Sequence, residues 1–282
     1  MLEINNLTVE FGTKKVLDEV SMKAEKGKVL GIVGESGSGK TMTALSVMGL
    51  LSQDARVAKG SSIRLDGKEL TGLSEKELAA IRGNDIAMIF QEPMTSLNPT
   101  MKIGKQLEEA LRLHGHSGAE DNSGKGRGRR AYRQWLKEQV LEALKEACLP
   151  EPEKQYDRYP HELSGGMRQR VMIAMGTICR PDYLLCDEPT TALDVTTEKG
   201  ILELIDRIRN EHNMGIIFIT HDLKLLRGFA DNVVVMCRGK VVEQGSVEQI
   251  FNAPKEEYTR QLIASIPDRN HRRNVKAADA EK

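Results

Sequence analysis

The string GESGSGKT, at residues 34–41, constrains the fold of this chain more than any other feature. It has the spacing Gly, four residues, Gly, Lys and then Ser or Thr, and it lies between an apolar run at Val29–Val33 and a helical pattern at residues 41–50. Glycines let backbone N–H groups converge on phosphate oxygens, and the N-terminus of the following helix points its positive end at the same atoms. The pattern therefore predicts a phosphate-binding loop that joins a buried strand to a helix.

The residue types within this string suit a nucleoside triphosphate and magnesium. Lys40 places a positive charge at the β- and γ-phosphates, and the Thr41 hydroxyl is a ligand for Mg²⁺. The alternative is a glycine-rich turn without a ligand, which the position between a strand and a helix disfavours. The residues expected to bind ATP here are Gly34, Ser36, Gly37, Ser38, Gly39, Lys40, Thr41 and Thr43.

A second string, YLLCDEP, reads as an apolar strand that ends in two acids, Asp187 and Glu188. Such a strand places both carboxylates at the carboxyl edge of the sheet, where α/β proteins bind their ligands. We expect Asp187 to hold Mg²⁺, directly or through water, and Glu188 to act as general base toward the attacking water. A strand that ends in Asp-Glu is common, so this interpretation depends on the phosphate loop that precedes it.

In a third string, LSGGMRQR, Ser164 is suited to cap a helix, and the two glycines that follow it open that helix. Ser164, Gly165 and Gly166 therefore predict a second exposed helix N-terminus that binds an anion. One nucleotide already has its phosphate loop, so a second such end calls for a second subunit. We expect these residues to face the γ-phosphate of ATP held by a partner. The alternative is an ordinary capped helix.

The pattern of apolar residues divides the chain into four parts. Residues 1–92 read as strands with the phosphate loop, and residues 93–162 as a mostly helical insertion. Strand and helix alternate again over residues 163–252, which predicts an α/β core with parallel strands. Residues 253–282 form a C-terminal extension that we expect to be partly disordered. Within the insertion, the polar, glycine-rich residues 115–130 predict a mobile surface loop.

Charge and hydropathy narrow the class of protein. There are 41 basic and 41 acidic residues, so the sequence indicates no general nucleic-acid partner. No apolar run approaches the roughly 18 residues of a membrane span, and the first residues lack the pattern of a secretory signal. If the protein acts at a membrane, we expect it to do so by docking onto other subunits.

The three strings, with TALD and ITHD in the same order, resemble the nucleotide-binding subunit of ABC transporters over nearly the whole chain. The resemblance implies an α/β P-loop NTPase fold of the ABC-ATPase type. In that fold, a mixed sheet core carries an N-terminal antiparallel β subdomain and an inserted α-helical subdomain. It also implies an ATPase whose hydrolysis is coupled to transport.

The resemblance assigns further roles. Gln91 matches a glutamine that contacts Mg²⁺ and water and couples to the permease, and His221 matches a histidine that contacts the γ-phosphate and supports Glu188. Residues 192–194 match a loop across the dimer interface, so Asp194 is expected at the nucleotide. Phe11 matches an aromatic residue that stacks on adenine, although many relatives have Tyr there.

The strings FQEPMTSLNP and YTRQLIASIP are similar to those of the importers of dipeptides, oligopeptides and nickel. That group implies a second ATPase subunit, either a paralogue or a second copy. It also implies two transmembrane permeases that dock near residues 91–99, an external binding protein, and a peripheral place on the cytoplasmic face of the membrane. The cargo stays open between peptides, nickel and metal chelates.

Three other readings compete with this one. A soluble ABC ATPase of DNA repair or ribosomes would usually carry long heptad arms or two cassettes, and the sequence shows neither. A P-loop kinase leaves the LSGGMRQR string unexplained. A non-catalytic subunit does not explain why Lys40, Glu188 and His221 are all present.

Overall fold

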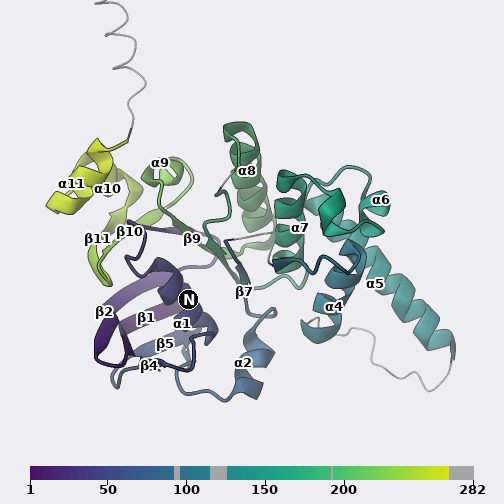
Figure 1. Ribbon diagram of the computed structural model, residues 1–282, viewed down its shortest axis with the longest axis horizontal. Helices are drawn as coiled ribbons and strands as arrows, with labels where there is room; N and C mark the ends of the chain where they lie inside the picture. The colour runs from purple at the N-terminus through teal and green to yellow at the C-terminus, as the bar shows by residue number, and fades with distance from the viewer. Residues whose placement is uncertain (92–95, 115–125, 192, 267–282) are drawn as a thin grey trace, which may run out of the picture.

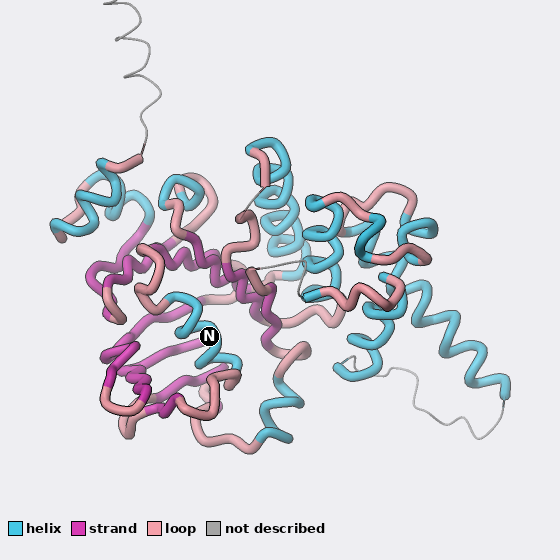
Figure 2. Tube along the Cα trace, viewed as in Figure 1, coloured by secondary structure: helices cyan, strands magenta, loops and turns pink. Residues whose placement is uncertain are grey.

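The computed structural model describes residues 1–91, 96–114, 126–191 and 193–266. Two sheets lie on one side and a group of helices on the other, as Figures 1 and 2 show. Within the described ranges, no helix is both long enough and apolar enough to cross a membrane.

The central sheet is built around parallel strands in the order β11-β10-β3-β9-β8-β7. Its edge pair, β10 and β11, runs antiparallel, as two strands joined by a short turn must. The strands span β3 (Val29–Val33), β7 (Ile86–Ile89), β8 (Tyr183–Asp187), β9 (Gly215–Thr220), β10 (Asn232–Cys237) and β11 (Lys240–Ser246). The register pairs Val33 with Thr220 and Asp187 with Ile219, so β3, β8 and β9 end at the same edge.

The second sheet is antiparallel and comes from the first part of the chain. Its order is β2-β1-β5-β6, with β4 paired to β1. The strands are β1 (Leu2–Phe11), β2 (Lys14–Ala24), β4 (Ala55–Val57), β5 (Ser62–Leu65) and β6 (Lys68–Glu69). The sequence predicted the long strands from their apolar residues, but not the short β4 and β6.

Helices cover the central sheet and form the group on the right of Figure 1. That group contains α4 (Ile103–His114), α5 (Gly126–Glu146), α6 (Pro152–Tyr156) and α7 (Gly165–Thr177). Elsewhere the described ranges contain α1 (Lys40–Met48), α2 (Glu75–Ile81), α8 (Val195–His212), α9 (Leu223–Leu226), α10 (Val247–Asn252) and α11 (Glu257–Ala264). A short 3₁₀ turn, Pro160–Glu162, precedes α7.

The helical insertion follows the predicted spacing, with one correction. In α4 the buried residues Ile103, Leu107 and Leu111 recur every four positions, so one face packs inward. The predicted loop 115–130 is too long at its C-terminal end, because α5 already begins at Gly126. Arginines are good helix formers, and they extend the helix backward from its packed part. Residues 115–125 lie outside the described ranges.

Alternating residues of the central strands separate two hydrophobic cores. In β3, Val29 and Val33 face the core shared with the helical group, whereas Leu30 and Ile32 face the core shared with the antiparallel sheet. This follows from the twofold period of a strand. A sheet buried on both faces holds its strand ends rigidly, and those ends carry the candidate site.

Candidate active site

The phosphate loop joins β3 to α1 through two glycines in left-handed conformations. Gly37 and Gly39 have φ of 78° and 103°, which disfavour other residues. At Gly34 a Cβ atom would lie 2.2 Å from the Met236 carbonyl oxygen, so only glycine fits against β10. The Ser38 hydroxyl is buried and has no hydrogen-bond partner in the described part of the chain. These features suit a loop that closes around phosphate oxygens.

Lys40 begins α1 and is only 5% exposed. Its Nζ donates hydrogen bonds to the carbonyl oxygens of Gly34 at 2.8 Å and Glu35 at 3.0 Å. Burial lowers the pKa of Lys40, while the carboxylates of Glu188 and Asp187 act in the opposite direction. An anionic phosphate would favour the charged amine, because opposite charges stabilise each other strongly at buried positions.

Asp187 ends β8 and lies beside the start of α1. The Thr41 hydroxyl donates a hydrogen bond to Asp187 Oδ1 at 3.1 Å. Burial raises the pKa of Asp187, and the Thr41 hydrogen bond opposes that shift. Two oxygen donors side by side fit a hard cation such as Mg²⁺, which usually takes one or two protein ligands with phosphate oxygens. No group of three or more His, Cys, Asp or Glu side chains in the described ranges forms a metal cage.

Glu188 is the point at which three further side chains meet. Its Oε2 lies 3.1 Å from Gln91 Nε2, 3.0 Å from Thr191 Oγ1 and 3.1 Å from His221 Nδ1. The backbone φ of Glu188 is 47°, which is a left-handed conformation. This conformation costs free energy in a residue other than glycine, and residues that adopt it occur most often at functional sites. The sequence predicted Gln91 and His221 here but missed Thr191, which opens the TALD string but was assigned no role in it.

The glycine-rich start of α7 lies apart from the phosphate loop. Ser164 caps the helix by accepting a hydrogen bond from Met167 N at 3.3 Å. A Cβ atom at Gly165 would meet nothing within 4 Å, whereas one at Gly166 would lie 2.8 Å from the Thr197 methyl group. Figure 1 shows α7 and α1 on opposite sides of β7. Within one chain, the structure therefore does not bring these two motifs together.

Three other predicted residues occupy different surroundings. The Asp194 carboxylate caps α8 by accepting hydrogen bonds from Thr196 N and Thr197 N. The Thr43 hydroxyl is buried and donates to the Gly39 carbonyl at 3.0 Å, so it stabilises the first turn of α1. Phe11 is half-buried at the end of β1. Residue 192, predicted with Asp194 at the dimer interface, lies outside the described ranges.

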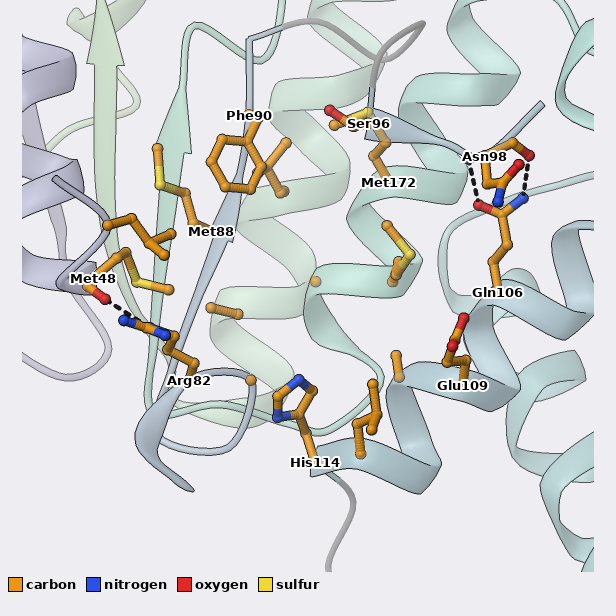
Figure 3. Close-up of a pocket in the computed structure, with 18 of the residues that line it drawn as sticks. Met48, Arg82, Met88, Phe90, Ser96, Asn98, Gln106, Glu109, His114 and Met172 are labelled. Carbon is orange, nitrogen blue, oxygen red and sulfur yellow. Dashed lines mark hydrogen bonds between the residues drawn. The ribbon is translucent and has the colours of Figure 1, made fainter. Parts of the chain in front are cut away.

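A pocket of about 710 Å³ lies beside this site, between β7 and the helical group (Figure 3). Methionine and aromatic side chains gather in it, among them Met88, Phe90 and Met172. Phe90 is 41% exposed, and the next residue is Gln91, which contacts Glu188. The pocket and the candidate catalytic carboxylate are thus joined by two consecutive residues.

Comparison with known proteins identifies the family. A family model described as ABC transporter matches residues 17–191. Dipeptide transport ATP-binding protein DppD of Haemophilus influenzae is 44% identical over 95% of this chain and 78% of its own length. Peptidoglycan transport ATP-binding protein YejF of Agrobacterium fabrum is 47% identical, also over 95% of this chain, which spans only 47% of the length of that relative.

Solved structures agree with the fold. The dimeric structure of MJ0796, a bacterial ABC transporter cassette, superimposes with a TM-score of 0.72 at 26% identity, over 88% of this chain and 99% of the other. A second MJ0796 dimer, bound to ADP and Pi in a post-hydrolysis state, matches equally well. The predicted family and fold are thereby confirmed: this chain belongs to the ABC transporter family, in which it is an ATPase.

Proposed function

We propose that this chain is the ATP-hydrolysing subunit of an importer and energises the uptake of peptides through separate permeases. The observation that carries the proposal is the contact of Gln91, Thr191 and His221 with one oxygen of Glu188. A carboxylate oriented by three side chains, near a buried lysine, suits a base that positions water for in-line attack. Phe11, at the rim of the antiparallel sheet, would stack on the adenine.

The oxygen donors beside the phosphate loop support Mg²⁺ as the cofactor. Thr41 and Asp187 would hold it together with phosphate oxygens, and Gln91 is the third proposed ligand. When bound, Mg²⁺ neutralises negative charge on the β- and γ-phosphates. Lys40 adds a second positive charge, while Glu188 takes a proton from the water and His221 holds Glu188 in place.

We further propose that two ATPase subunits share each nucleotide. The start of α7 is open at Gly165 and lies away from the chain's own phosphate loop. Ser164, Gly165 and Gly166 would then face the γ-phosphate held by a partner, with Asp194 nearby. Binding of ATP would favour the closed pair and hydrolysis would release it, because the ligand binds one state more tightly. The partner is a paralogue or a second copy.

The pocket between β7 and the helical group supports docking of a permease. Apolar side chains that remain exposed in a pocket mark contact sites for other proteins. Phe90 would contact the permease while Gln91 contacts Glu188. Because the two residues are consecutive, a movement of Phe90 would shift Gln91 and so change its contact with Glu188. This arrangement favours coupling between transport and hydrolysis.

The relatives support peptides as the class of cargo. The names of DppD of Haemophilus influenzae and of OppD of Bacillus subtilis, which is 44% identical to this chain, describe dipeptide and oligopeptide transport. Nickel and metal chelates remain the alternative, since the cargo is chosen by other subunits. An external binding protein and a position on the cytoplasmic face of the membrane complete the proposal.

The four parts predicted from the sequence are also proposed as functional units. Residues 1–92 and 163–252 would form the nucleotide-binding core, and residues 93–162 the arm that meets the permease. Residues 253–282 would form a C-terminal extension of that core, of which residues 267–282 are not described.

The proposal is tested by isolating the tagged chain from membranes and identifying its partners by mass spectrometry. The informative variant is Phe90→Asp, which places a charge in the apolar pocket. Val57→Asp is the matched control, because Val57 on β4 is also 41% exposed but lies outside the pocket.

We expect wild type and Val57→Asp to retain a second ATPase and two membrane subunits, and Phe90→Asp to lose the membrane subunits. Partners that are only ribosomal or DNA-bound would contradict the proposal. Equal retention of the membrane subunits by Phe90→Asp would move the docking surface elsewhere.

A further inference from the structure

The C-terminal helix α11 reaches the phosphate loop from the far end of the sequence. The Glu35 amide donates a hydrogen bond to Tyr258 Oη at 3.3 Å, between residues 223 positions apart. Burial raises the pKa of Tyr258, so its hydroxyl is neutral near pH 7. In Figure 1, α11 lies beside α10 and β11, at the opposite end of the molecule from α4 and α5.

Glu35, whose amide contacts Tyr258, is already part of the phosphate-binding geometry. The Glu35 carbonyl oxygen accepts hydrogen bonds from Ser38 N at 3.1 Å and from Lys40 Nζ at 3.0 Å. A contact at the Glu35 amide therefore restricts the same segment whose carbonyl oxygen holds the lysine amine. Tyr258 therefore influences the position of Lys40 through this segment, without contacting Lys40 itself.

The helix that carries Tyr258 is itself fixed to the central sheet. Glu243, on β11, accepts hydrogen bonds from Lys255 N at 2.8 Å and Glu256 N at 3.1 Å. Thr259, next to Tyr258, is 0% exposed. The chain is thus tied to β11 immediately before α11 begins, two residues ahead of Tyr258.

A second brace comes from the hairpin that precedes α11. The Gly239 amide, in the β10–β11 turn, donates a hydrogen bond to the Ser38 carbonyl at 3.0 Å. The Gly239 carbonyl in turn accepts from Asp18 N on β2 at 2.9 Å. The phosphate loop is thus held by α11 and by the β10–β11 turn. Both follow His221, the last predicted catalytic residue, in the sequence.

We propose that Tyr258 is a positioning residue that holds the phosphate loop ready for nucleotide through the Glu35 amide. This inference rests on the proposed role of residues 34–41 as the phosphate loop. A loop held in its binding conformation loses less entropy when phosphate arrives, so apparent affinity rises with the fraction of competent molecules. We expect Tyr258 to affect nucleotide binding and not the hydrolysis step, because Tyr258 does not contact Glu188 or its three partners.

The test is Tyr258→Phe, which removes one oxygen and keeps the ring. We expect the Kd for Mg-ADP, titrated into the purified full chain, to rise about three- to tenfold, which is the range for one lost hydrogen bond. In the assembled transporter, the KM for ATP should rise by a similar factor. The kcat should stay within about twofold, because bound phosphate itself then orders the loop.

Two further variants make the result specific. Tyr132→Phe removes the same atom from a half-buried tyrosine on α5, far from the loop, and should leave Kd and KM unchanged. Glu243→Ala unties α11 and should raise Kd as Tyr258→Phe does. The double variant should lose less affinity than the product of the two effects, because both act on the same contact.

Amide hydrogen exchange at residues 34–40 gives a readout independent of activity, and it should be faster in Tyr258→Phe. A lower thermal midpoint with Kd, KM and exchange unchanged would overturn the inference and leave Tyr258 a packing residue. If the wild-type chain itself fails to bind nucleotide, the phosphate loop and this inference fall together.

Discussion

Glu188 combines a left-handed backbone with three polar neighbours at a single carboxylate oxygen. The main chain alone would not choose this conformation, so the surrounding structure holds it. The Glu188 amide donates to the Ile219 carbonyl at 3.0 Å, which ties the residue to β9. If Glu188 is the base, as we propose, it needs no rearrangement before it orients a water molecule.

This arrangement predicts that binding and hydrolysis of ATP can be separated by mutation. Glu188→Gln should retain nucleotide binding but slow turnover by ~10²–10⁴-fold, the usual effect of removing a positioned acid or base. Lys40→Ala should instead weaken binding by about ten- to a hundredfold, because it removes a charged hydrogen bond to phosphate. Phosphate release assays and nucleotide titrations measure the two effects.

Glu203→Gln, on the exposed face of α8, is the control for charge removal and should behave as wild type. Near-normal hydrolysis by Glu188→Gln in a purified complex would remove Glu188 from its role. Unchanged nucleotide affinity in Lys40→Ala would count against the phosphate loop.

Residues within motifs were accessible to prediction because their backbone geometry is local. Gly34, Lys40 and Asp187 lie where a strand, a glycine turn and a helix must place them. Thr191 and Tyr258 were not predicted, since their contacts depend on how distant segments pack. Both lie in strings that carry the family resemblance, TALD and YTRQLIASIP, but the strings alone do not show which side chain contacts the site.

At the scale of elements, the β5–β6 hairpin depends on one carboxylate. Glu69 accepts hydrogen bonds from Ser62 Oγ, Thr71 Oγ1 and Ile63 N. Burial favours the protonated form, but these hydrogen bonds outweigh it and lower the pKa of Glu69 to about 2. A carboxyl group with a lowered pKa stabilises the fold above its unfolded pKa, and that stabilisation is lost as pH falls.

Glu69→Gln should therefore lower the thermal midpoint near neutral pH. The difference from wild type should shrink as pH falls from about 4.5 toward about 2, where wild-type Glu69 also becomes protonated. Thermal unfolding followed by circular dichroism measures this, with Glu203→Gln as control. A difference that stays constant over this range would mean that the carboxylate charge does not stabilise the hairpin.

Long periodic elements were predicted well and short ones poorly. The short strand Val29–Val33 is an exception and has the predicted bounds, because a short apolar run followed by glycines favours a strand buried on both faces. The helix α2 was missed, although its capping box, Ser74 with Glu77, is a readable signal. The start of α5 was missed because Gly126 and Gly128 are typical of loops. In the structure these glycines lie in the first turn of α5, which continues from the packed part of the helix.

At the scale of the whole molecule, the central sheet links three surfaces. The carboxyl edge of β3 and β8 carries the proposed nucleotide site, and the end of β7 leads into the pocket that contains Phe90. In Figure 1, α7 lies on the other side of β7 from α1, which follows the proposed phosphate loop. The phosphate loop and the LSGGMRQR string could be identified from the sequence. That they lie apart within one chain could be seen only in the structure.

That separation leads to the central claim, that two ATPase subunits close around shared nucleotides. It is tested most directly by measuring the mass in solution of the Glu188→Gln chain, with its partner ATPase, at saturating Mg-ATP. The account predicts a pair that forms only with nucleotide and is lost when Ser164→Arg is added, while each chain still binds ATP. Subunits that stay apart with nucleotide bound, or a pair indifferent to Ser164→Arg, would contradict it.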